Sequence, residues 1–76
     1  MRDVCRCHEL GISDQKRREV FEQKRRFLEE MPFRELAGHL ALHQMVYTPS
    51  GLCQACEDEL FRMDFRICGR RLMEGR

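Results

Sequence analysis

This sequence of 76 residues contains no tryptophan, one tyrosine and two prolines. It also lacks the uncharged apolar run of about 20 residues that a membrane-spanning helix needs. The first residues, Met1 to Cys5, are not followed by the apolar core and small-residue cleavage site of an export signal. We therefore expect a protein that folds in water, has no membrane partner and resides in the cytoplasm.

A strong net charge is missing as well. The formal charge is +1 with every cysteine counted as neutral, and four zinc-bound thiolates with one Zn²⁺ would change it to −1. Overall charge therefore does not indicate nucleic acid. Lysine is scarce, since twelve of the 14 basic residues are arginine. That bias favours forked hydrogen bonds to carboxylates or phosphates, either within the protein or on a partner.

The chain is short for a protein held together by its core alone. A chain of this length buries only about 60% of the surface that its unfolded state exposes, so it needs an additional stabilising feature. The sequence contains five cysteines. In the cytoplasm, cysteines bind metals or remain free thiols more often than they form disulfides. We therefore expect a metal site.

Three segments have the apolar spacing of helices: 13–31, about 32–47 and about 56–73. Ser13 is a suitable N-cap for the first, and Pro32 prevents that helix from continuing. Residues 1–12 show neither helical nor alternating order, so we expect a loop there. No internal repeat, low-complexity tract or linker is recognised. The sequence thus predicts a mainly α-helical fold of three helices in a single domain, residues 1–76.

The second helix is apolar on almost all sides, which is typical of a central, buried helix. Gly38 lies inside it and would weaken it by about 1 kcal/mol unless it lets a neighbouring helix approach closely. On the first helix, Lys24 falls on the apolar side. The Lys24 side chain could extend its apolar stem along the edge of the core, or it could bind an acidic partner through its ammonium group.

Two cysteine pairs flank the helices. Cys53 and Cys56 form a CxxC motif at the start of the third helix, and Cys5 and Cys7 form a CxC motif in the N-terminal loop. Two thiols at this spacing bind one tetrahedral ion, and the N–H groups of the helix start stabilise their negative charge. A CxxC motif supplies half of such a site. We expect the CxC motif to supply the other half, so that one structural Zn²⁺ per chain joins the N-terminal loop to the last helix.

Other ligand sets remain open. His8 forms a CxxH motif with the first cysteine and could replace Cys7. His39 and His43, one turn apart on the second helix, could instead complete the site with the CxxC motif. We favour the CxC motif because it explains why an irregular segment carries three ligand-type side chains. Cys68, on the third helix, is expected to be a small buried hydrophobic residue.

The CxC motif followed by CxxC, in Cys5, Cys7, Cys53 and Cys56, resembles the thiol–zinc switch of the redox-regulated heat-shock chaperone family. The resemblance covers only these motif residues. It implies a site of four thiolates, and it implies a redox switch as an alternative function. The CxxC motif at a helix start is also similar to the second half of treble-clef zinc fingers.

The sequence carries no catalytic signature. Four thiol ligands would close the zinc shell, and there is no HExxH or HxE motif and no glycine-rich phosphate loop. We expect that the protein is not an enzyme.

Arg62, Arg66 and Arg70 follow one another at four-residue spacing on the third helix. Like charges at this spacing repel one another unless phosphates or carboxylates lie beside them. This row makes a nucleic-acid-binding zinc finger with an arginine-rich helix face an alternative function.

Methionine and phenylalanine occur five times each. Together with the amphipathic helices, they offer more apolar surface than one small core can hide. We therefore expect a regulatory or adaptor protein that docks on a larger protein partner. By analogy with other small zinc proteins, the transcription machinery is the first class to consider. The same surface could join two copies in a homodimer.

Overall fold

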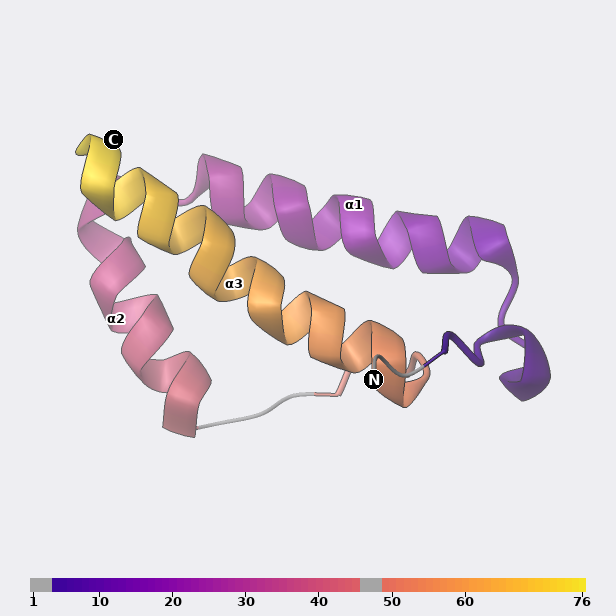
Figure 1. The fold of residues 1–76 in the computed structure, drawn as a ribbon. Helices are drawn as coiled ribbons and strands as arrows, with labels where there is room; N and C mark the ends of the chain where they lie inside the picture. The colour runs from indigo at the N-terminus through magenta and orange to yellow at the C-terminus, as the bar shows by residue number, and fades with distance from the viewer. Residues whose placement is uncertain (1–3, 46–48) are drawn as a thin grey trace.

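The computed structural model describes residues 4–45 and 49–76, and these ranges contain three α-helices and no strand (Figure 1). The helices are α1 (Asp14–Glu30), α2 (Phe33–Met45) and α3 (Gln54–Glu74), preceded by a short 3₁₀ helix, η1 (His8–Leu10). The predicted three-helix architecture is confirmed. The expected end of the second helix, Val46 and Tyr47, lies outside the described residues. Among the described helices, none combines the length and apolar character needed to cross a membrane.

The predicted boundary residues of α1 have the geometry expected of them. The Lys16 N–H group donates a hydrogen bond to Ser13 Oγ at 3.1 Å, so Ser13 caps the helix as predicted. At the other end Met31 has extended backbone angles, φ −61° and ψ 134°, because the proline that follows it disfavours helical angles. The Pro32 carbonyl then accepts the N–H of Glu35 at 2.9 Å and begins the first turn of α2.

α3 is the helix on which the other two pack. α1 and α2 lie on different sides of it, as Figure 1 shows, and each makes its main interhelical contacts with α3. The larger core cluster lies where the three helices meet and consists of Leu28, Met31, Leu36, Met63, Ile67 and Cys68. The predicted burial of Cys68 is confirmed, since none of its side chain is exposed.

The prediction that the second helix is central is wrong. Leu36 of α2 is fully buried, but Phe33 is 44% exposed and Leu42 is 62% exposed. A methyl group placed at Gly38 would meet no atom of the described residues within 4 Å, so this glycine does not mark a close helix contact. α2 packs mainly on α3, so Phe33 and Leu42 remain exposed, while Leu40 packs against the core cluster.

Arg71 closes the C-terminal end of α1. Its guanidinium donates hydrogen bonds to the carbonyl oxygens of Leu28, at 3.0 Å, and Met31. The end of a helix leaves such carbonyls without partners inside the helix, and an arginine from a neighbouring helix can satisfy them. This contact joins the last turn of α3 to the α1–α2 connection.

Candidate metal centre

Cys5, Cys7, Cys53 and Cys56 come together beside the first turn of α3, with all four sulfur atoms within 4.8 Å of one another. The Sγ atom of Cys56 lies 3.5 Å from that of Cys5 and 3.6 Å from that of Cys7. The Sγ atoms of Cys5 and Cys53 are 3.8 Å apart. With metal–sulfur bonds of about 2.3 Å, a tetrahedral ion separates its sulfur ligands by about 3.8 Å. The four thiols therefore have the spacing of a tetrahedral site and could hold a metal ion.

The start of α3 supplies two of these thiols. Cys53 is the N-cap residue, and Cys56 lies in the first turn. The turn that precedes α3 is anchored to the helix by the buried carboxylate of Glu57. This carboxylate accepts a hydrogen bond from the Ser50 hydroxyl and another from the Ser50 backbone N–H, which lies at 2.8 Å. This anchor fixes the direction in which the chain enters the CxxC motif.

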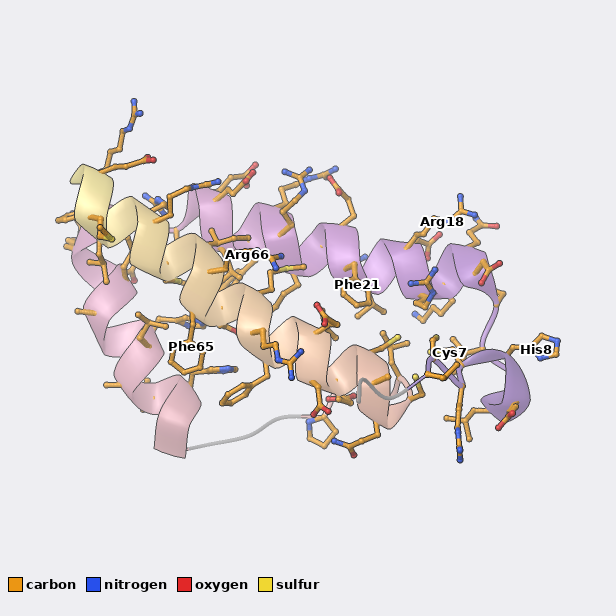
Figure 2. The ribbon with its side chains drawn as sticks, in the orientation of Figure 1. Cys7, His8, Arg18, Phe21, Phe65 and Arg66 are labelled. Atoms are coloured by element: carbon orange, nitrogen blue, oxygen red, sulfur yellow. The ribbon has the colours of Figure 1, made fainter. Side chains whose placement is uncertain are left out.

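The N-terminal segment supplies the other two thiols. Cys7 is buried, and its carbonyl accepts the Ile12 N–H at 2.9 Å, which folds the segment back on itself through η1. The Arg6 N–H donates to the Cys53 sulfur at 3.2 Å. Cys5 is exposed at the edge of the cluster. The segment predicted to be a loop therefore contains a 3₁₀ turn, and that turn directs Cys7 toward α3 (Figure 2).

The four thiols do not ionise equally. Burial raises the pKa of Cys7 and of Cys56, and at Cys56 the neighbouring thiols add to this effect. Burial acts in the same direction on Cys53, but hydrogen bonds from the N–H groups of Arg6 and Cys56 and from nearby thiols outweigh it and lower the pKa of Cys53 to about 6. A metal ion must therefore displace the protons of Cys7 and Cys56, so its affinity falls as the pH falls.

The alternative ligand sets are not assembled. His8 is exposed, and its ring points away from Cys7 and the sulfur cluster (Figure 2). His39 and His43 lie on α2 and face Asp64 instead of the CxxC motif. The structure therefore brings together the four cysteines that we favoured. Four thiolates would fill a tetrahedral shell without an open position for substrate, an arrangement suited to a structural ion.

Asp64 forms a second polar cluster that sequence reasoning missed. Its carboxylate is fully buried, and Lys24 Nζ lies 2.7 Å from Oδ2. His39 Nε2 is hydrogen-bonded to Oδ1, and His43 Nδ1 lies 3.4 Å from Oδ2. The sequence left open whether Lys24 extends along the core edge or meets an acidic partner. The structure supplies an acidic partner within the chain.

The three arginines of the predicted row are all exposed on α3. Arg62 forms an ion pair with Glu59 at 3.3 Å, and Arg70 forms one with Glu29 of α1 at 3.6 Å. Within the described residues, Arg66 has no ion-pair partner. Carboxylates of the chain thus relieve part of the repulsion in the row, although exposed pairs of this kind contribute only about 0–1 kcal/mol each.

Separate replacement of Cys7 and His8 tests which of them binds the metal. We expect His8→Ala to keep both metal and fold, because its ring lies outside the cluster. Cys7→Ser removes one of four ligands, so this variant should no longer retain bound metal during gel filtration. Elemental analysis of the purified variants measures the difference. The opposite result would assign the CxxH set.

We compared the chain with protein-family models, with curated proteins and with solved structures, and none of them matches it. Its function is therefore inferred from its own residues.

Proposed function

We propose that the chain is a small non-enzymatic docking protein. One Zn²⁺ at Cys5, Cys7, Cys53 and Cys56 holds the fold, and the surface between α1 and α2 binds a larger protein partner. Four cysteine ligands in tetrahedral arrangement are typical of structural zinc. A closed ligand shell favours a structural role over a catalytic one, so the function is sought on the helices that the ion holds in place.

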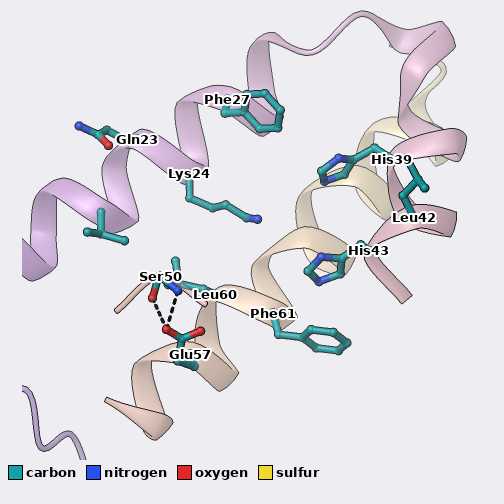
Figure 3. A pocket seen from close by; sticks show the side chains of 11 residues that line it. Gln23, Lys24, Phe27, His39, Leu42, His43, Ser50, Glu57, Leu60 and Phe61 are labelled. Atoms are coloured by element: carbon teal, nitrogen blue, oxygen red, sulfur yellow. Dashed lines mark hydrogen bonds between the residues drawn. The ribbon is translucent and has the colours of Figure 1, made fainter. Parts of the chain in front are cut away.

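The observation that carries this proposal is an open apolar surface, which we call the α1–α2 groove. Two cavities of about 560 and 580 Å³ share Phe27, His39 and Leu42 in their walls. Phe27 is 56% exposed and Leu42 is 62% exposed. Figure 3 shows the first cavity, with Phe27 on α1 facing the side chains of α2 and α3. Large apolar side chains that remain exposed around a shared hollow are typical of a docking surface.

The charges at the groove indicate the kind of partner. Glu30 and Glu35 line the second cavity, and neither forms an ion pair with another described residue. A groove between two helices accommodates an amphipathic helix through its apolar face. Acidic groups beside such a groove favour a partner segment with lysine or arginine next to its apolar residues. We therefore propose a basic amphipathic helix of a larger protein, with the transcription machinery as the first class to search.

Leu42→Glu tests this surface. Since the side chain is largely exposed, the variant should fold and retain its zinc, but it places a charge in the groove and should weaken partner binding by roughly tenfold or more. The matched control is Leu10→Glu, because Leu10 on η1 is 61% exposed and does not line the groove. A tagged chain captures the partner from cell extract, and the purified partner is then titrated against each variant. Equal affinities of the two variants would contradict the proposal.

The same capture experiment separates the alternatives. A captured complex that resists nuclease and also forms with Arg62, Arg66 and Arg70 replaced by glutamate supports protein docking. A complex that nuclease or these substitutions abolish supports the nucleic-acid alternative. Release of zinc by mild peroxide, reversed by a thiol reductant, would support the redox alternative. Sedimentation of the purified chain measures whether the groove joins two copies.

A further inference from the structure

Two packed helices each carry a pair of ligand-type residues one turn apart. His39 and His43 lie on α2, and Asp64 and Cys68 lie on α3. Residues at this spacing share one face of a helix. The ligand atoms of His39, Asp64 and Cys68 all lie within 4.8 Å of one another, and His43 lies outside this group of three. His43 Nδ1 is 3.4 Å from Asp64 Oδ2. Bonds of about 2.0–2.1 Å to a tetrahedral Zn²⁺ separate nitrogen and oxygen ligands by about 3.4 Å.

We propose that His39, Asp64 and Cys68 form a second metal site, with His43 as a fourth ligand that turns toward the ion on binding. This site binds a divalent transition-metal ion such as Zn²⁺ more weakly than the four cysteines do. Two imidazoles, a carboxylate and a thiolate are a ligand set that suits zinc and cobalt. This site shares no residue with the cysteine cluster, but His39 and His43 also line the α1–α2 groove. Metal binding is therefore measured on the protein without a partner, so that its outcome does not depend on docking.

His43 is not engaged in a strong hydrogen bond. Its Nε2 atom is buried and has no hydrogen-bond partner in the described part of the chain, and its Nδ1 contact with Asp64 is long for a hydrogen bond. The ring is held in place by aromatic side chains, with centroid distances of 4.5 Å to Phe61 and 5.6 Å to Phe65. An imidazole that is close to the site and only weakly hydrogen-bonded can turn toward the ion and serve as a ligand.

Lys24 explains why this site should bind more weakly. Its ammonium supplies the positive charge that balances the buried Asp64 carboxylate. A bound Zn²⁺ would instead be balanced by Asp64 and by the thiolate of Cys68, whose proton is released on binding. Burial raises the pKa of Cys68, which adds to the cost of that release. The Lys24 side chain is 29% exposed and extends into the solvent-connected cavity shown in Figure 3, so it can move aside for the ion.

A cobalt titration of the zinc-loaded protein tests the proposal. Zinc stays in the cysteine site because four thiolates favour it over Co²⁺. We expect one further equivalent of Co²⁺ per chain, with the visible absorption of a tetrahedral ion and the charge-transfer band of a single thiolate. No further equivalent, or release of zinc with a four-thiolate cobalt spectrum, would overturn the proposal.

Variants assign the ligands. Cys68→Ala should remove the thiolate band and weaken Co²⁺ binding by roughly tenfold or more, and His39→Ala should weaken it similarly. His8→Ala removes an exposed histidine and should change neither signal. Lys24→Met should bind Co²⁺ more tightly than the parent chain, because the competing ammonium is gone. Zinc content and circular dichroism verify that each variant is folded. Cobalt binding unaffected by both Cys68→Ala and His39→Ala would overturn the assignment.

Discussion

Removal of the proposed structural zinc with a strong chelator is expected to unfold the chain. The core cluster beside the site consists of Cys7, Leu52, Cys53, Cys56 and Leu60, so three of its five buried residues are the proposed ligands themselves. Structural zinc contributes an apparent binding free energy of about 10–16 kcal/mol in small zinc domains. A small domain has a total stability of about 5–15 kcal/mol, so loss of the ion removes a contribution of the same size.

Circular dichroism during chelator titration measures this effect. The helical signal and the cooperative thermal transition should disappear together with zinc, and both should return when zinc is added back under reducing conditions. A chelated chain that keeps its helical signal and a cooperative transition would contradict a structural role for the ion.

Cys53→Ser should lose zinc and unfold even when no chelator is added. This residue is a proposed ligand at the N-cap position of α3, where its side chain makes no capping hydrogen bond. A serine can still cap the helix, so the substitution acts through the metal site. Cys68→Ala is the matched control, because Cys68 is also buried on α3 but lies outside the cysteine cluster. It should keep the tight zinc and lose only about 1 kcal/mol of stability.

The helices were predictable because local chemistry decides where they begin and end. Ser13 offers a side-chain acceptor to the first turn of α1, and Pro32 forces the residue before it out of helical angles. α3 begins at Gln54, about two residues earlier than predicted, with Cys53 at its N-cap position. Effects of this kind involve residues within a few positions of one another, which a sequence shows directly.

The arrangement of the helices was not predictable in the same way. An apolar composition indicates that α2 buries some of its surface but not how many neighbours cover it, and Leu42 is exposed because α2 packs mainly on α3. Asp64 carried a signal that was overlooked, since it lies on the buried face of α3 between Met63 and Ile67. Its partners on α1 and α2 are far away in sequence, so only the folded chain identifies them.

The second large effect is expected from Lys24→Met. This change removes the only lysine that pairs with Asp64 in the described chain, while a methionine retains most of the apolar stem. The Asp64 carboxylate is fully buried, and a methionine side chain offers it no hydrogen bond in place of the ammonium. Loss of one partner of a buried ion pair costs about 3–5 kcal/mol, because the remaining charge is left uncompensated. With one equivalent of zinc per chain, which fills the cysteine site and leaves the second site empty, the unfolding free energy should fall by this amount.

A double variant tests whether the loss of stability comes from the ion pair between Lys24 and Asp64. If the cost comes from an unbalanced Asp64, then Lys24→Met combined with Asp64→Leu should be more stable than Lys24→Met alone, since apolar side chains replace both charges. Lys16→Met is the control: this lysine is exposed on α1, and its loss should change stability by no more than about 0.5 kcal/mol. Urea denaturation at one fixed zinc concentration measures all of these variants, because bound metal itself shifts apparent stability. A double variant less stable than Lys24→Met would contradict this account and would assign the stability of the cluster to the hydrogen bond between Asp64 and His39.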